Sequence, residues 1–145
     1  MHKDRCEENM SEIRDYSGDP VALNIHRFTR ANPYFRTALW TGDNLQVTLM
    51  SIPVGGEIGL EMHPHTDQFL RIESGCAHIM MGKCKEKLTY HQKANSDYSI
   101  MIPAGTWHNI KNIGNIALKL YSVYAPPQHP FGTVHKTKAD SDKAE

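Results

Sequence analysis

Short runs of alternating or β-branched residues recur along this chain, and they constrain its fold more than any other feature. The runs follow one another at intervals of about ten residues and are separated by turn-forming sequences such as Gly42-Asp43 and Gly55-Gly56. No intervening segment has the length and period of a crossover helix, so an antiparallel sandwich or small barrel is predicted rather than a parallel sheet. The predicted strands cover residues 36–40, 45–52, 58–65, 68–73, 77–81, 88–92, 98–102, 108–112 and 117–125.

The length of 145 residues suits a single domain. Both ends are polar and charged, so we expect an N-terminal tail over residues 1–17 and a C-terminal tail over 133–145, each mobile or lying on the surface. The barrel is then expected over 18–132. Residues 7–16 are compatible with a short helix, although they include few apolar positions for an amphipathic stripe.

The charge balance and the cysteines restrict the class of partner and the compartment. Sixteen basic and sixteen acidic residues give zero formal net charge, and no dense Lys/Arg cluster is present to neutralise a run of phosphates, so a small molecule is favoured over a nucleic acid. No apolar stretch approaches the roughly 20 residues that cross a bilayer, so no membrane association is expected. Three cysteines cannot pair completely and the chain begins with polar residues, which favours the cytoplasm.

Three histidines stand where two predicted strands can present them to one cation. His63 and His65 are two residues apart in the predicted strand 58–65, and side chains at such positions project from the same face of a strand. His108 begins another predicted strand. Imidazoles bind divalent transition metals well, so the three histidines predict a metal site.

Three further residues are candidates for catalysis. Glu61 lies two residues before His63, so it faces the predicted site as a general base, unless the strand frays there and the carboxylate is solvated. Tyr90 and Tyr124 can donate phenolic hydrogen bonds to a substrate, or serve as wall residues with their hydroxyls at a rim. The core-facing side of the last strand is predicted to hold Leu118, Leu120, Ser122 and Tyr124.

Two motifs give the chain a resemblance to the single-domain cupins, whose fold is a double-stranded β-helix, or jelly-roll barrel. The resemblance covers roughly residues 45 to 125 and is closest to the small mannose-6-phosphate-isomerase-like cupins. The first motif, over 57–75, is a His-x-His pair, an acidic ligand and a later glycine, matched here by His63, His65, Gln68 and Gly75. The second motif, over 97–112, is matched by Pro103, Gly105, His108 and Asn112.

The chain departs from the first and second motifs in three ways. Glu57 stands six residues before His63, and Asp97 begins the second motif, where the family has glycine in both places. Gln68 replaces the usual glutamate, and the gap from His65 to it is one residue shorter than usual. A glutamine brings no negative charge, so a shell of three histidines and one glutamine would hold a cation less tightly but leave it a stronger Lewis acid.

The resemblance implies an all-β cupin with an N-terminal arm, and a metal held by His63, His65, Gln68 and His108. The ion would be one divalent transition metal: Fe, Mn, Zn or Ni. A small oxygenated, sugar-like substrate and metal-assisted isomerase or lyase chemistry are expected, with an Fe(II)-dependent dioxygenase and a non-catalytic small-molecule-binding cupin as alternatives. A further alternative is a protein that has the cupin fold but no longer binds a metal. Family habit and the need to cover sheet edges predict a homodimer.

Overall fold

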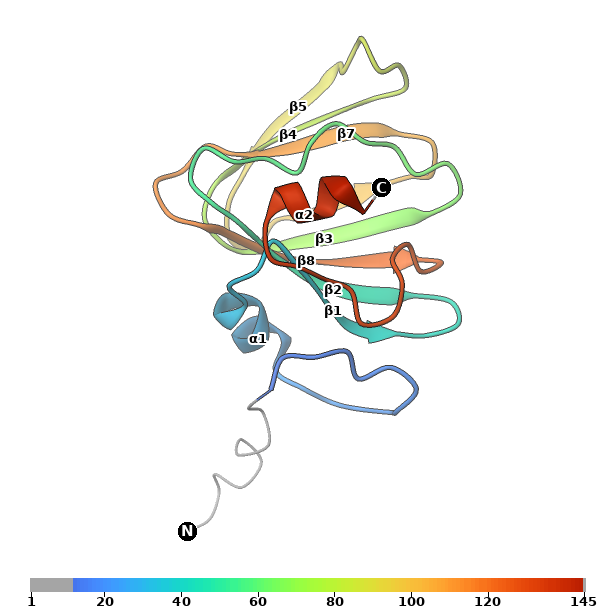
Figure 1. The fold of residues 1–145 in the computed structure, drawn as a ribbon. Coiled ribbons are helices and arrows are strands. Elements are labelled where there is room, and N and C mark those ends of the chain that lie inside the picture. Colours follow the sequence, from blue (N-terminus) through green and yellow to red (C-terminus); the bar gives the residue numbers. More distant parts are fainter. Residues whose placement is uncertain (1–11, 145) are drawn as a thin grey trace.

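A computed structural model describes residues 12–144, and most of the regular structure in this part of the chain is β (Figure 1). The helices are α1 (Ile25–Ala31) and α2 (Lys138–Lys143). The strands are β1 (Arg36–Thr41), β2 (Gln46–Ile52), β3 (Asp67–Ser74), β4 (Ala77–Gly82), β5 (Tyr90–Ala94), β6 (Ser99–Ile102), β7 (Trp107–Asn112), β8 (Leu118–Ala125) and β9 (Val134–His135).

The strands form two sheets that face each other as the walls of a barrel (Figure 1). One sheet has six strands in the order β6-β3-β8-β2-β1-β9, and the other has three in the order β5-β4-β7. Each pairing of neighbouring strands is antiparallel. The predicted antiparallel all-β architecture is therefore confirmed.

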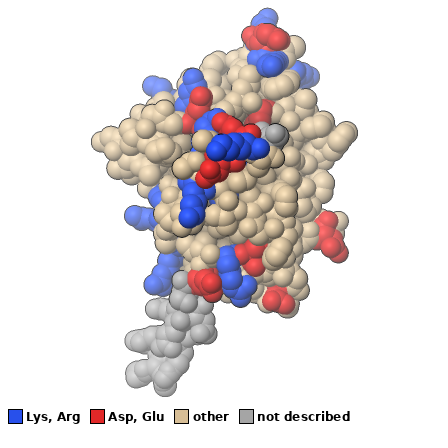
Figure 2. All heavy atoms as spheres, in the orientation of Figure 1, with Lys and Arg blue, Asp and Glu red and all other residues tan. Residues whose placement is uncertain are grey.

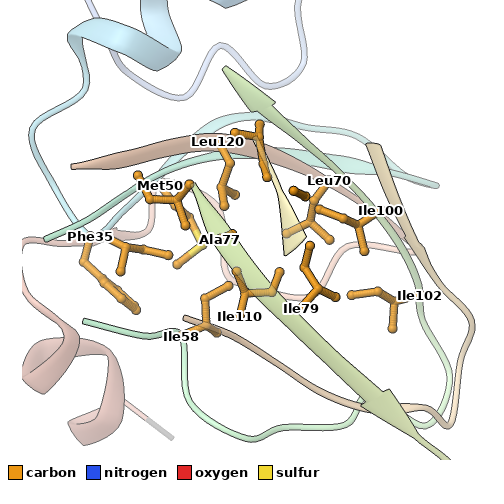
Figure 3. Packing of buried hydrophobic residues seen from close by; sticks show 14 residues of the cluster. Phe35, Met50, Ile58, Leu70, Ala77, Ile79, Ile100, Ile102, Ile110 and Leu120 are labelled. Carbon is orange, nitrogen blue, oxygen red and sulfur yellow. The ribbon is translucent and has the colours of Figure 1, made fainter. Parts of the chain in front are cut away.

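The main core lies between the sheets, where apolar side chains from both walls meet (Figure 3). Burial alternates along β8, as the period of two requires, and its inward residues are the four predicted from the sequence. Leu70, Leu118 and Leu120 are fully buried. Each such side chain stabilises the fold by about 1.5–3 kcal/mol relative to an exposed one, so the core fixes the register of the strands that carry the site.

An N-terminal arm covers part of the outer face of the six-stranded sheet. Phe28 of α1 packs with Leu39 and Leu49 in a second apolar cluster. The side chain of Asn24 caps α1 by accepting a hydrogen bond from the Arg27 amide. The arm explains why Glu73, which strand alternation places on the outer face, is nearly buried: the His26 imidazole of α1 contacts its carboxylate.

The predicted strand over residues 58–65 is wrong. This segment has one isolated bridge, Glu61 to His108, with a second just before it from Glu57 to Lys111, and it turns at Pro64 and His65. Proline has no amide hydrogen to donate to a ladder, and the positive φ of 106° at Gly59 is foreign to a strand, so the alternating pattern could not become regular pairing.

The other differences from the predicted elements are smaller. The strand predicted over 88–92 begins later, at Tyr90. The helix considered over 7–16 falls partly outside the described residues, and residues 12–16 are not helical. Asp97, where the family has glycine, adopts φ 76°. Aspartate tolerates this left-handed conformation better than most residues, and Arg71 donates to its carboxylate at 2.8 Å.

The polar C-terminal segment, expected as a mobile or surface-lying tail, lies largely exposed on the surface, and it forms regular structure within residues 134–144. β9 pairs with β1. α2 begins with a capping box in which Thr137 and Asp140 bond each other's backbone amides. The guanidinium of Arg36 on β1 donates to the hydroxyl of the buried Ser141 at 2.7 Å, which ties α2 to the sheet.

The surface gives no sign of a single-sign electrostatic field on the face shown in Figure 2, where positive and negative side chains are intermixed. Among residues 12–144, no helix is long and apolar enough to cross a membrane.

Candidate metal centre

Glu61, His63 and His108 converge on one point at the end of the barrel. Glu61 and His63 lie in the loop between β2 and β3, and His108 lies on β7. One ligand atom from each of the three residues lies within 4.8 Å of the other two. Three side chains of these types in this proximity could hold a divalent metal ion.

Backbone hydrogen bonds hold the loop against β7 although no regular strand forms there. The Glu61 amide donates to the His108 carbonyl at 3.0 Å, and the His108 amide donates to the Glu61 carbonyl at 2.9 Å. The carbonyl of His63 accepts from the Gly105 amide at 2.9 Å. Gly105 has a φ of 83°, so the glycine of the second motif permits the turn that fixes His63.

The two imidazoles present nitrogen lone pairs to the same space. The Nδ1 of the buried His108 donates to the Thr106 carbonyl at 2.9 Å, so in the neutral imidazole the lone pair lies on Nε2. That Nε2 lies 3.3 Å from Oε2 of Glu61, and the His63 Nε2 lies 3.6 Å from the same oxygen. Both Nε2 atoms are buried without a hydrogen-bond partner. Buried polar atoms rarely lack partners, so this donor set fits a metal ligand role.

The electrostatics of the cluster favour an ionised carboxylate. Burial alone would raise the pKa of the Glu61 carboxyl, but the neighbouring imidazoles of His108 and His63 outweigh burial and hold the pKa well below its ordinary value. A carboxylate that stays ionised supplies the negative charge that Gln68 lacks.

Gln68 supplies a further oxygen in the barrel interior. Its side chain is buried on β3, and its Nε2 donates to the hydroxyl of Ser122 at 3.3 Å. This bond directs the amide hydrogens to the hydroxyl, and Oε1 is left buried without a partner. Gln68 pairs with Tyr124 across the β3–β8 ladder, and the Tyr124 ring lies 5.9 Å from the ring of His63.

A pocket of about 360 Å³ opens beside the cluster. Tyr124 is buried, and burial raises the pKa of its hydroxyl, so it is a neutral phenol. The segment that follows β8 brings His129 and His135 to the same pocket. The lining residues are Glu61, Met62, His63, Gln128, His129, Pro130, Thr133, His135 and Ala144.

The structure does not bring His65 or Tyr90 to this cluster. His65 is exposed in the turn with Pro64, because the strand that would have aligned it with His63 does not form. Tyr90 is half exposed in a groove lined with Ile79 and Met81. Asp67 is also outside the cluster, and its carboxylate accepts a hydrogen bond from the Ala104 amide at 2.9 Å. Metal binding by His63, His65, Gln68 and His108 stays a prediction.

The sequence predicted Glu61 as a general base and not as a metal ligand. The spacing of the first motif nevertheless indicates that Glu61 can be a ligand. If the motif is shifted by two residues, Glu61 and His63 take the places of its two histidines. Gly55 then stands six residues before Glu61, and four residues separate His63 from Gln68. In this alignment both the glycine and the gap before Gln68 agree with the first motif, but a glutamate replaces the first histidine of the motif.

The chain resembles known proteins over most of its length. A family model described as Cupin domain matches residues 48–124. The uncharacterized protein YrkC of Bacillus subtilis is 57% identical over 133 residues, which are 92% of this chain and 72% of that protein. The uncharacterized protein L612 of Acanthamoeba polyphaga mimivirus is 40% identical, over 82% of this chain and 73% of its own length. The crystal structure of BH2720 from Bacillus halodurans superposes with a TM-score of 0.90 at 56% identity, covering 90% of this chain and 99% of that one.

Proposed function

The chain belongs to the cupin family, and we propose that it is a metal-binding cupin that acts on a small oxygenated, sugar-like substrate by metal-assisted isomerase or lyase chemistry. The family and the jelly-roll fold predicted from the two motifs are confirmed. Because this fold hosts many unrelated reactions, the proposed chemistry rests on the site itself.

One observation carries the proposal: two buried, unpartnered imidazole nitrogens lie against an ionised carboxylate beside a small pocket. Glu61, His63 and His108 would hold the ion, with the Gln68 oxygen as a further donor. This mixture of nitrogen and oxygen ligands suits Fe, Mn, Zn or Ni. A bound divalent ion would supply Lewis acidity toward a carbonyl or hydroxyl oxygen of the substrate.

The residues around the ion have separable roles. An effective general base has a pKa near the working pH, so the low pKa of Glu61 suits a metal ligand better than a base. Tyr124 stays protonated and can donate a hydrogen bond to a substrate oxygen. Met62 and Pro130 give the lining of the pocket an apolar part.

The same donor set also supports a second candidate, an Fe(II)-dependent dioxygenase. Two histidines and one carboxylate with open coordination positions are the ligands typical of non-haem Fe(II) oxygenases. The cluster of Glu61, His63 and His108 has this composition, whereas the three histidines expected from the sequence do not.

Two assays on the wild-type protein separate these functions. A panel of sugars and sugar acids is first incubated anaerobically with protein loaded with Mn²⁺ or Zn²⁺, and the isomerase or lyase proposal predicts product by NMR spectroscopy. The second assay measures oxygen uptake with Fe(II)-loaded protein. Uptake that requires both substrate and Fe(II), without anaerobic turnover, would replace the first proposal by the dioxygenase. Ligand binding without turnover in either assay would indicate a non-catalytic binding cupin.

We also propose that the protein works in the cytoplasm as a homodimer. Cys76 and Cys84 are free thiols, as a reducing compartment would maintain them. β6 stands at one edge of the six-stranded sheet, and edge strands are commonly covered. Light scattering coupled to gel filtration should give twice the mass of one chain, and a monomer at micromolar concentration would contradict the dimer.

A further inference from the structure

Two histidines meet on the outer face of the three-stranded sheet, away from the metal centre. His78 lies on β4 and His91 on β5. The Nε2 of His78 is 3.1 Å from the Nδ1 of His91, and the ring centroids are 5.2 Å apart with an interplanar angle of 32°. Ala77 and Ile79 on either side of His78 are buried in the core, so strand alternation places His78 outside the barrel.

Strand pairing fixes the separation of the two histidines. In the ladder between β4 and β5, Lys93 is opposite His78 and Met80 is opposite His91. The histidines are therefore diagonal neighbours on one face of the sheet, a separation that long side chains can bridge. The backbone of both residues is already ordered by the ladder, so binding a ligand would cost only the ordering of two side chains.

The distance between the two nitrogens suits two ligands of one metal ion. An imidazole nitrogen binds Zn²⁺ at about 2.0–2.1 Å. Two nitrogens 3.1 Å apart can both reach that distance if the angle between the metal bonds is about 100°. This angle lies between those of neighbouring ligands in octahedral and tetrahedral sites. Without metal, a hydrogen bond between the rings places one proton between the same nitrogens, and the ion would replace this proton.

The charges around the pair predict weak binding. Among residues 12–144, no carboxylate lies within ion-pair distance of either ring of the pair. Lys93 and Lys111 lie opposite His78 on the two neighbouring strands. Their positive charges oppose a cation, although water and salt screen this repulsion because His91 is exposed. We therefore expect a dissociation constant in the micromolar range.

We propose that His78 and His91 form a second, exposed site for a divalent transition metal such as Zn²⁺, Ni²⁺ or Cu²⁺, with water as the remaining ligands. Imidazole suits these ions, and Cu²⁺ should bind most tightly. Neither histidine belongs to the metal centre or lines its pocket, so the site does not depend on the proposed function. Dialysis against metal-free buffer should empty this exposed site, whereas the buried centre is proposed to retain its ion.

The test titrates Zn²⁺ into ¹⁵N-labelled wild-type protein at pH 7.5 and follows each histidine ring by NMR spectroscopy. The signals of the Nε2 of His78 and the Nδ1 of His91 should shift together, with one midpoint in the micromolar range. In calorimetry, His78→Gln and His91→Gln should each weaken this binding roughly tenfold or more.

Two further variants sharpen the calorimetric result. Gln92→Ala is the matched control, because Gln92 is adjacent to His91 in sequence but lines a groove on the other face of β5. It should leave the affinity of the site unchanged. Lys93→Gln removes a positive charge opposite His78 and should tighten binding by roughly two- to tenfold. A damaged fold cannot produce such a gain.

Three results would overturn the second site: no shift of either ring up to about 1 mM Zn²⁺, a shift of only one ring, or unaltered Zn²⁺ binding in His78→Gln. The signals of His63 and His108 report on the metal centre in the same titration. Failure of that centre is therefore distinguishable from failure of the exposed pair.

Discussion

At the scale of single residues, the carboxylate of Glu61 determines how tightly the centre can hold a cation. Glu61→Gln keeps an oxygen donor but removes the negative charge between His63 and His108. We expect the affinity for Zn²⁺ or Mn²⁺ to fall by roughly 10- to 100-fold, as for other changes that disturb metal sites. Competition with a chromophoric chelator measures the change.

Glu57→Gln is the matched control. The carboxylate of Glu57 accepts a hydrogen bond from Nδ2 of Asn109 at 2.8 Å and is not part of the metal cluster. This variant should bind metal with an affinity within about twofold of the wild type. An equal loss in both variants would show that the charge of Glu61 has no special role.

His129 should make the stability of the metal-free protein depend on acid pH. Its pKa is about 3 in the folded protein, chiefly through burial, and about 6.5 in an unfolded chain. Between these values the unfolded state binds a proton that the folded state does not. The free energy of unfolding therefore falls as the pH drops from about 6.5 toward 3, by up to about 1.4 kcal/mol per pH unit from this group.

His129→Gln should reduce that slope by as much as one proton. Urea unfolding curves between pH 7 and pH 4, recorded with a chelator present, give the slope for both proteins. At pH 7 and above the two proteins should show no difference in slope, since His129 is neutral in both states there. Parallel stability profiles across the whole range would contradict a low pKa for His129.

At the scale of elements, Asn112 holds the turn between β7 and β8. Its side-chain amide donates to the carbonyls of Ile52 and Ile116 at 3.0 and 2.9 Å, and its oxygen accepts from the Gly114 amide at 2.9 Å. Asn112→Ala should lower the free energy of unfolding by about 2–3 kcal/mol, because each buried hydrogen bond contributes about 1 kcal/mol. The exposed Asn115→Ala should change it by less than about 0.5 kcal/mol. Equal urea midpoints for the two variants would exclude this role.

The strands were predictable because alternation and turns are local signals, and β8 shows this most clearly. The loop before β3 was not predictable in the same way. Its apolar and polar residues alternate as in a strand, but Gly59 and Pro64 prevent regular strand pairing. α2 carries a local signal in its capping box, but only contact with Arg36 shows that this polar segment packs. Polarity alone therefore did not show that the C-terminal segment forms a strand and a helix.

At the scale of the whole molecule, the site joins parts of the chain that are far apart in sequence. The motifs located His63 and His108 because each depends on a short, regular spacing. The spacing of the first motif also indicates Glu61 as a ligand, if the motif is aligned on Gly55 and Gln68. No local pattern could show that Arg36, Gln46 and His129 meet beside the metal centre, because β1, β2 and the segment after β8 are brought together only by the folded sheet.

The central claim is that Glu61, His63 and His108 hold a metal and that the exposed His65 does not. Elemental analysis of protein purified without an affinity tag tests it directly, with circular dichroism confirming that each variant is folded. We predict about one equivalent of a divalent transition metal per chain in the wild type and in His65→Ala, and less than about a tenth in His63→Ala and His108→Ala. A wild type with substoichiometric amounts of every transition metal, or loss of metal in His65→Ala but not in His63→Ala, would contradict it.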